Sequence, residues 1–444
     1  MVATTDFDLT LKPAAGVPSP FNQNSELDQH LGGTIWMAND GGVAWSDDGG
    51  VKWNPAAGLP TLDPINIAGL AGVGGAPALY IGTGDNDSFF SPDGGNTWRD
   101  TSWHLGDADA WFADLARADW VLQFAPVSRG GPGILVFRGG PYPDAGSANF
   151  HRVAQPEGGN CTSGFVLLGY APLVRTLATE LAPPDGDVVT IGTRSDGARV
   201  VFRTQAISSI TDASLWEDSA HAQQVGPPLP NPATDMVVGI VQASGGHLNP
   251  AIFVSDTVSL WSLDRVAQAW RQLVPGGPPG RSAGTATRFW VDPFNPLLIY
   301  LLDVDLFRVS LDGGASWLFD AELTKAMSGD GKLSLTAAPG GRFTTVVRNM
   351  LFVRTERFTR FAFGSAGVMY TVDGVRWQTL LNAVALGGCP ESGFFDGITD
   401  PLDRTLYVEF DGRSILRISG IPAPSPLSPP NFSLLDLAAI LTEA

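Results

Sequence analysis

A short segment of the form Ser/Thr-x-Asp-Gly that ends in Trp recurs along the chain, and it constrains the fold more than any other feature. Its copies occupy residues 46–53, 91–98, 310–317 and 371–377. Gly supplies positive φ without a Cβ clash, while Asp and Ser or Thr hydrogen-bond within a tight turn. Apolar alternating residues precede the clearest copies, and the Trp opens the next strand. Each copy therefore predicts a β-hairpin turn with the Trp ring packed beneath it.

Polar turns of a second kind recur between the apolar strands. They fall near residues 40, 86, 130, 195, 256, 304, 366 and 412. A repeat of about 45–65 residues has the size of a four-stranded propeller blade. The sequence therefore predicts an all-β fold, a single β-propeller of eight four-stranded antiparallel blades. Seven blades is the alternative, because the region 105–220 can be divided in more than one way.

The chain divides into three predicted parts. Residues 1–30 form an N-terminal segment whose strand at 5–12 closes the ring by pairing with the last blade. Residues 31–420 form the propeller. Residues 421–444 form a Pro-rich strap followed by a short helix at 432–443. Strap and helix are expected to pack on the outside of the propeller.

Composition supports a turn-dense β protein and excludes some partners. The chain of 444 residues has 53 Gly, 34 Pro, 13 Trp and 24 Phe, and a net charge of −18. Such an acidic chain lacks the basic face that phosphate backbones require, so no nucleic-acid partner is expected. Its charge also disfavours an anionic membrane surface.

The repeated segments resemble the Asp-box, or BNR repeat, of sialidases, sortilins and xyloglucan-active glycoside hydrolases. A second phrase at 291–296, followed by the apolar residues 298–300, looks like the inner-strand phrase of sortilin-type and xyloglucanase-type blades. The resemblance covers roughly residues 30–420. It implies that the boxes lie on one face of the propeller and that ligands bind on the other. Accordingly Asp48, Asp93, Asp312 and Asp373 are predicted to stabilise turns rather than to catalyse.

The resemblance also implies a carbohydrate-directed function. A glycoside hydrolase would use a pair of carboxylates on the channel face, about 5–10 Å apart. A non-catalytic propeller that binds glycan or protein, sortilin-like or lectin-like, is the alternative, and a polysaccharide lyase is the third. Whether the chain is an enzyme thus stays open at this point. The expected partner is a glycan or polysaccharide, with protein as a second option.

The candidate catalytic carboxylates lie in the turns between second and third strands. Asp40, within Asn39-Asp40-Gly41-Gly42, resembles the Thr-Asp-x-Gly-Gly-x-Tyr phrase of the xyloglucan hydrolases, in which the Asp is catalytic. Asp85, Asp303 and Asp411 are its expected partners from other blades. The alternative for each is that Asp simply suits a tight turn.

Candidate ligand-binding and metal-binding residues lie partly in the same turns and partly in the segment 103–111, which contains a second acidic phrase. The aromatic side chains of Trp103 and Trp111 offer flat faces for sugar rings, and two arginines, Arg194 and Arg413, lie in the turns of their blades. Carboxylates at alternate positions can bind a hard cation such as Ca²⁺. Those positions are Asp85, Asp87, Asp107 and Asp109. Two ordinary polar turns are the alternative, and no cofactor is required by the predicted chemistry.

The compartment follows only in part from the sequence. The residues after Met1 show no basic start and no apolar core, and no apolar run is long enough to span a membrane. A mature secreted or cell-surface form is favoured because the resembling families are mostly secreted, and a cytoplasmic protein is the alternative. The Arg-rich, Lys-poor composition looks bacterial. Cys161 and Cys389 are either bridged or two buried thiols.

Overall fold

The computed structural model describes most of the strands and turns between residues 26 and 422. The described residues are 26–31, 34–39, 42–48, 50–55, 64–70, 76–83, 88–100, 111–113, 120–125, 133–138, 149–152, 165–167, 188–193, 196–203, 220, 223–229, 233–242, 248–256, 259–264, 267–273, 288–292, 295–303, 305–335, 347–353, 356, 358–383, 385–386, 394–400, 404–410 and 415–422. The expected closing strand at 5–12, the expected helix at 432–443 and both cysteines lie outside them.

The described strands form eight antiparallel sheets. Each of the first four sheets has four strands: β1 (Glu26–Leu31), β2 (Thr34–Asn39), β3 (Gly42–Ser46) and β4 (Asn54–Pro55); β5 (Pro64–Leu70), β6 (Ala78–Thr83), β7 (Ser88–Ser91) and β8 (Arg99–Asp100); β9 (Trp111–Ala113), β10 (Trp120–Ala125), β11 (Gly133–Arg138) and β12 (Asn149–Arg152); β13 (Phe165–Leu167), β14 (Val188–Thr193), β15 (Arg199–Arg203) and β16 (Gln223–Gln224).

The remaining sheets follow the same order. They contain β17 (Ala233–Gln242), β18 (Leu248–Asp256), β19 (Leu260–Asp264) and β20 (Ala269–Gln272); β21 (Arg288–Val291), β22 (Ile299–Asp303), β23 (Leu306–Ser310) and β24 (Leu318–Phe319); β25 (Val347–Phe352), β26 (Arg360–Gly364), β27 (Gly367–Thr371) and β28 (Gln378–Asn382); and the three strands β29 (Phe394–Asp400), β30 (Thr405–Phe410) and β31 (Ile415–Ser419). Helix α1 (Ala321–Met327) follows β24.

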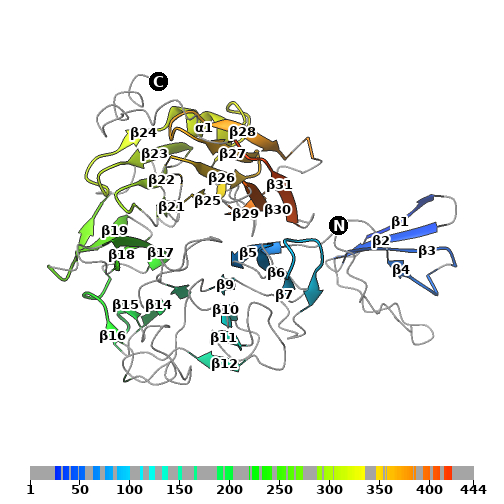
Figure 1. The fold of residues 1–444 in the computed structure, drawn as a ribbon, viewed down its shortest axis with the longest axis horizontal. Coiled ribbons are helices and arrows are strands. Elements are labelled where there is room, and N and C mark those ends of the chain that lie inside the picture. The colour runs from blue at the N-terminus through cyan, green and yellow to red at the C-terminus, as the bar shows by residue number, and fades with distance from the viewer. Residues whose placement is uncertain are drawn as a thin grey trace.

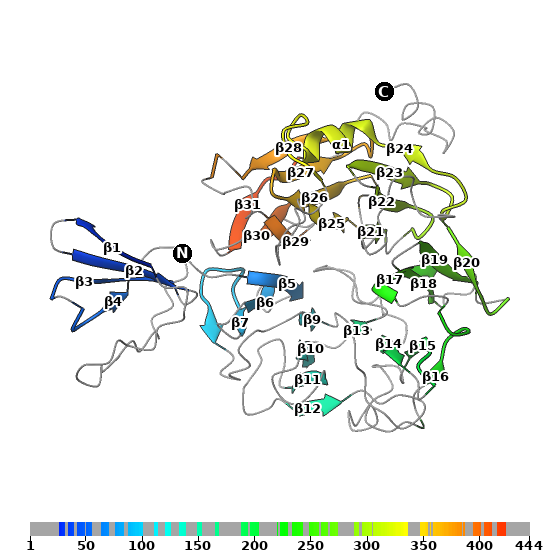
Figure 2. The same cartoon turned by 180° about the vertical axis from the view of Figure 1, so that it is seen from behind.

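The sheets are arranged radially. Figures 1 and 2 together show β5, β9, β13, β17, β21, β25 and β29 toward the centre of a ring, with the later strands of each sheet farther out. The sheet β1–β4 lies beside this ring, and the same is seen from behind in Figure 2. Small antiparallel sheets packed radially, each with its first strand innermost, are the arrangement of a β-propeller.

Apolar side chains fill the spaces between neighbouring sheets. Between the sheets β21–β24 and β25–β28, a cluster that includes Tyr300, Phe307, Met350 and Trp377 also takes in the apolar side of α1. A further cluster joins the first and last sheets of the ring, where Ile67, Leu79 and Ile81 of β5–β8 pack on Ile398 and Tyr407 of β29–β31. These two sheets therefore pack directly against each other.

Each sheet overlaps the residues of one of the eight predicted blades. The strands predicted at 65–70, 78–82, 361–363 and 406–408 match β5, β6, β26 and β30. The first strand, β1, begins at Glu26, before the predicted start of the propeller at residue 31. The number of blades that close the ring stays a prediction, since one sheet lies beside the other seven.

Helix α1 is an element that the repeat pattern did not predict. Asp320 caps it, because its carboxylate Oδ1 accepts a hydrogen bond from the backbone N–H of Leu323 at 2.8 Å. The side chains of Leu323 and Met327 are buried against the neighbouring sheet. The helix thus occupies the space that would otherwise be open between β24 and the sheet β25–β28.

Candidate functional site

The repeated Ser/Thr-x-Asp-Gly turns share one hydrogen-bond pattern. In each turn the hydroxyl donates to the Asp Oδ1, at 2.8 Å from Ser46, 2.9 Å from Ser91, 2.8 Å from Ser310 and 3.0 Å from Thr371. The same hydroxyl oxygen accepts a backbone N–H from the Gly that follows, at 2.7–2.9 Å. The glycines have positive φ, for example +70° at Gly94 and +85° at Gly95, as predicted. All polar atoms at the heart of the turn are therefore engaged within it.

The carboxylates of these turns are committed to their own backbone. The backbone N–H of Lys52 holds the pKa of Asp48 below its usual value, with further help from the Ser46 hydroxyl. Burial alone would raise the pKa of Asp312, but hydrogen bonds from the backbone and hydroxyl of Ser316 outweigh it and lower the pKa. A carboxylate that stays ionised and fully occupied suits a structural role rather than proton transfer.

Most predicted site residues fall outside the described part of the chain. This holds for Asp40, Asp85, Asp87, Asp107, Asp109, Asp411, Trp103, Arg194 and Arg413. Trp111 is the first residue of β9, although its side chain is not described. The predicted catalytic, ligand-binding and calcium-binding roles of these residues stay predictions. Within the described ranges, no group of three or more His, Cys, Asp or Glu side chains is arranged to hold a metal ion.

Asp303 is the one predicted catalytic carboxylate whose side chain is described. It ends β22, and its Oδ2 forms an ion pair with Nε of Arg308 on β23 at 2.7 Å. The carboxylate side chain is 6% exposed and the Arg308 side chain is 37% exposed. The neighbouring Asp305 accepts hydrogen bonds from Ser334 and Leu335, so it anchors the loop that follows α1. Both carboxylates of this turn thus have partners within the fold.

A second polar position recurs at the beginning of the inner strands. The pairing register shifts near the start of β5, β17, β25 and β29, which is the mark of a β-bulge. Each bulge carries Asn or Asp: Asn66, Asp235, Asn349 and Asp396. We call these starts of the inner strands the inner rim. Antiparallel pairing puts the inner rim on the same face as the turns between second and third strands.

Asp396 is the most unusual carboxyl of the inner rim. Its Oδ1 accepts hydrogen bonds from the Asn349 side-chain amide at 2.9 Å and from the backbone N–H of Gly397 at 2.7 Å. Burial nevertheless raises its pKa to about 6, and these two bonds only partly oppose the effect. The residue retains partial solvent exposure, as do Asn349 and Asn66. A carboxyl that keeps its proton up to about pH 6 and is reachable from solvent can donate a proton to a bound ligand.

Reasoning from the sequence missed Asp396. The pair Asp396-Gly397 reads as a turn signal, whereas the structure places it inside β29. The only available signal was the recurrence of Asn or Asp three residues into an inner strand, as in Pro-Ile-Asn at 64–66 and Val-Arg-Asn at 347–349. That recurrence becomes visible only once the bulges align the strands.

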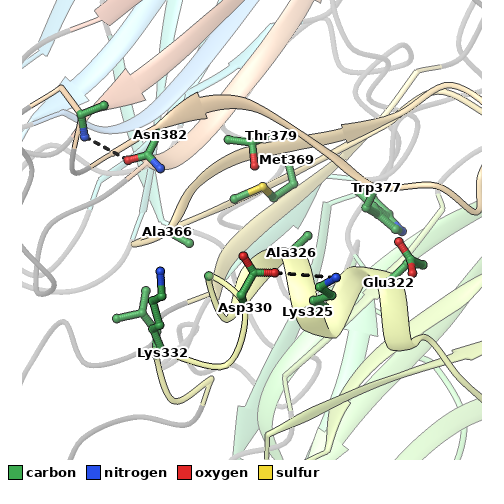
Figure 3. Close-up of a pocket in the computed structure, with 13 residues that line it drawn as sticks. Glu322, Lys325, Ala326, Asp330, Lys332, Ala366, Met369, Trp377, Thr379 and Asn382 are labelled. Carbon is green, nitrogen blue, oxygen red and sulfur yellow. Dashed lines mark hydrogen bonds and ion pairs between the residues drawn. The ribbon is translucent and has the colours of Figure 1, made fainter.

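A groove of about 710 Å³ lies at the periphery, between α1 with its following loop and the strands β27 and β28. Figure 3 shows Lys332 and Asn382 at one end and Glu322 with Trp377 at the other, with Met369 and Ala326 between them. Lys325 and Asp330 form a long ion pair of 3.9 Å along one side. The groove therefore has an apolar middle and ends of opposite charge.

A buried polar cluster lies behind the Trp377 end of this groove. Trp317 ends the same repeated turn in the preceding sheet, β21–β24. Its indole N–H donates to the carbonyl of Leu273, the residue just after β20. For Trp377 the equivalent acceptor would be the carbonyl of Asp320, the residue just after β24. That carbonyl already accepts hydrogen bonds from Thr324 of α1. Among the described residues, Trp377 Nε1 and Asp320 Oδ2 have no partner with full hydrogen-bond geometry. Burial raises the pKa of Asp320 to about 6, and the Leu323 N–H and the nearby Trp377 indole N–H only partly oppose the rise. Both side chains are at least nine-tenths buried.

Comparisons with known proteins return similarity in overall structure. No protein-family model matches the chain. No curated protein matches it either. Similar solved structures include YCF48 bound to D1 peptide, at 13% identity over 82% of this chain and 95% of that one, with a TM-score of 0.45, and YCF48 from Cyanidioschyzon merolae, at 14% identity over 80% and 96%, with a TM-score of 0.41. The GH74 xyloglucanase from Xanthomonas campestris is similar at 12% identity over 90% and 72%, with a TM-score of 0.24.

The described residues include no helix long and apolar enough to cross a bilayer.

Proposed function

We propose that this protein is a carbohydrate-directed β-propeller that hydrolyses glycosidic bonds at the inner rim, with Asp396 as the proton donor. The observation that carries the proposal is the environment of Asp396, a carboxyl whose pKa is raised to about 6 by burial while part of its surface stays exposed. Glycoside hydrolysis needs one carboxyl that is protonated near neutral pH. The turn carboxylates Asp48, Asp93 and Asp312 have lowered pKa values and do not meet that need.

The neighbours of Asp396 suit a sugar ligand. Asn349 donates one amide hydrogen to Asp396, which leaves the second amide hydrogen for a ligand hydroxyl. Asn66 lies at the same position of β5, whose sheet packs against the sheet of Asp396. Short amides and a carboxyl that line one rim can hydrogen-bond several hydroxyl groups of one sugar chain.

The second carboxylate would act as base or nucleophile. Asp411 is our first candidate, because it directly follows Phe410, the register partner of Phe394 at the start of β29. Asp85 belongs to the turn after β6, in the sheet that packs on β29–β31, and is the next candidate. Asp40 follows β2, whose sheet lies beside the ring, so it is the least suited partner for Asp396.

Finer features of the fold belong to the same proposal. The hydrogen-bond pattern of the four Ser/Thr-x-Asp-Gly turns supports their assignment as Asp-boxes. Among the described residues β31 pairs only with β30. A fourth strand from residues 5–12 next to β31 is the closure that we propose. A propeller with these boxes that acts on polysaccharides would be secreted or held at the cell surface, and Ca²⁺ at Asp85, Asp87, Asp107 and Asp109 would be an accessory ligand.

Binding without turnover is the second candidate function. The ion pair between Asp303 and Arg308 favours it, because a carboxylate oxygen that is engaged by a guanidinium is not available to attack a substrate. If the other turn carboxylates are held similarly, the inner rim would bind a glycan or a protein segment and leave it intact.

One experiment separates these functions. Wild-type protein and Asp396→Asn are tested on a glycan array and in a reducing-sugar assay on plant and microbial polysaccharides, while absorbance of unsaturated products reports any lyase activity. Loss of a general acid should lower hydrolysis by roughly a hundredfold or more while glycan binding is retained. Wild-type hydrolysis should also fall as the pH rises through about 6, where Asp396 loses its proton. Binding without turnover in wild type would select the second candidate, and full activity of folded Asp396→Asn would exclude Asp396 as the acid.

A further inference from the structure

We propose that the groove between α1 and the strands β27 and β28 is a docking site for an extended polypeptide segment that carries a basic residue at one end and an acidic residue at the other. This site is separate from the inner rim and independent of the function proposed there. The acidic end of the segment lies at Lys332 and the basic end at Glu322, with apolar side chains between them.

The charge distribution of the groove defines this ligand. Lys332 is exposed and lies at one end of the groove, while Glu322 lies at the other (Figure 3). No ion pair of either side chain occurs among the described residues, whereas Lys325 and Asp330 between them already neutralise each other. Considering only the described residues, the two ends thus present a cation and a carboxylate that stand outside any ion pair. A complementary ligand must bear both signs of charge.

The middle of the groove supports a polypeptide rather than a sugar or a nucleic acid. Ala326 and Leu333 are partly exposed and provide apolar surface, and the buried side chain of Met369 lies beneath them as the floor of the groove. Thr379 and Asn382 are exposed on β28 beside it. The side-chain oxygen Oδ1 of Asn382 accepts the Ala385 N–H at 2.9 Å. The side-chain amide hydrogens of Asn382 are then directed to a backbone carbonyl of the ligand. The groove thus offers apolar, charged and amide groups. A peptide can match all three with its apolar side chains, its charged side chains and its backbone carbonyls.

The binding mode follows from the edge strand. The register of β28 shifts against β27 between Val368 and Met369, so a bulge interrupts the row of backbone groups along this edge. Bulged edges are poor templates for an added strand. The segment is therefore held by its side chains in the groove rather than by strand addition. The volume of about 710 Å³ lies in the range of about 300–1,000 Å³ that ligand pockets occupy.

The test uses short fluorescent peptides that share an apolar centre and differ only at their ends: Lys and Glu, Lys and Lys, Glu and Glu, or two Gln. Wild type should prefer the Lys/Glu peptide. Lys332→Glu should prefer the Lys/Lys peptide, Glu322→Lys should prefer the Glu/Glu peptide, and the double variant should regain the preference for Lys/Glu. Exposed ion pairs are weak, so each end should change affinity by roughly twofold to fivefold, and less at high salt.

Two further variants keep the result unambiguous. Ala326→Arg places a long side chain in the middle of the groove and should abolish binding of all the peptides, with the fold checked by circular dichroism. Arg417→Glu changes an exposed residue of β31, outside the groove, and should leave every affinity unchanged. Equal binding of all peptides by wild type, no binding of any, or affinities that do not follow the charge changes would each overturn the proposal. Since Asp396 lies outside the groove, Asp396→Asn should bind the peptides as wild type does.

Discussion

The buried carboxyl of Asp320 gives the protein an uncommon dependence of stability on pH. Burial raises its pKa from 3.8 to about 6, and the Leu323 N–H, the Trp377 indole N–H and the Arg360 guanidinium only partly oppose this. Between about pH 4 and pH 6 the unfolded chain has lost this proton while the folded chain retains it. Because the unfolded state then binds fewer protons, the free energy of unfolding falls as the pH rises through this window.

The magnitude follows from the same shift. The difference between about 6 and 3.8 is about 2.2 pKa units, and at about 1.36 kcal/mol per unit it corresponds to about 3 kcal/mol at neutral pH. Asp320→Asn removes this cost. Asn is as good an N-cap as Asp, and its carbonyl can keep the 2.8 Å bond from Leu323. The second carboxylate oxygen has no partner with full hydrogen-bond geometry, although the Trp377 indole N–H lies near enough to lower the pKa.

We therefore expect Asp320→Asn to raise the free energy of unfolding at pH 7 by up to about 3 kcal/mol and to have little effect below about pH 4. Urea unfolding followed by Trp fluorescence across this pH range measures the difference. Asp330→Asn, on the exposed loop after α1, is the control and should leave the profile unchanged. A variant that is no more stable than wild type at pH 7 would show that Arg360 and Trp377 compensate the buried charge fully, which would refute the reasoning.

Two further predictions concern backbone geometry and the turns. Asp93→Ala frees the backbone N–H of Thr97 and two hydroxyls, so thermal unfolding should show a loss of about 1–3 kcal/mol with no change in glycan binding; loss of binding in a variant of normal stability would contradict the structural role. Gly367→Ala should be the more damaging change, because φ is +143° and a Cβ would lie 1.9 Å from the carbonyl oxygen of Leu381. Gly197→Ala, with φ of +83° and no atom within 4 Å, should cost only about 1–2 kcal/mol, and equal losses from both glycine changes would be inconsistent with this clash.

The strands and turns were predictable because their signals are local. A Gly pair, an Asp and a Ser within a few residues define a turn regardless of what packs around it, and strands such as β22 and β30 are continuous apolar runs. Helix α1 carried a signal as well. Asp320 stands at the N-cap, Glu322 in the first turn and Lys325 in the last, but the repeat pattern assigned no helix there.

The site was less predictable because it depends on register and on burial. Asp396 becomes distinctive only when a bulge brings it beside Asn349 of the neighbouring sheet, 47 residues earlier in the chain. Its pKa reflects how many atoms surround it, which no short pattern encodes. Likewise, the groove joins α1 to strands that begin 40 residues after the helix ends, from Met327 to Gly367.

The central claim is that Asp396 is the proton donor of the inner rim, and a carboxyl titration tests it most directly. Protein labelled with ¹³C at the Asp carboxyls is followed by NMR across the acidic to neutral range, and Asp396→Asn identifies the signal. We expect this carboxyl to titrate near pH 6. Its signal should also shift when a polysaccharide that the protein hydrolyses or binds is added. Titration near the ordinary Asp value of about 3.9, with no response to any polysaccharide, would contradict it.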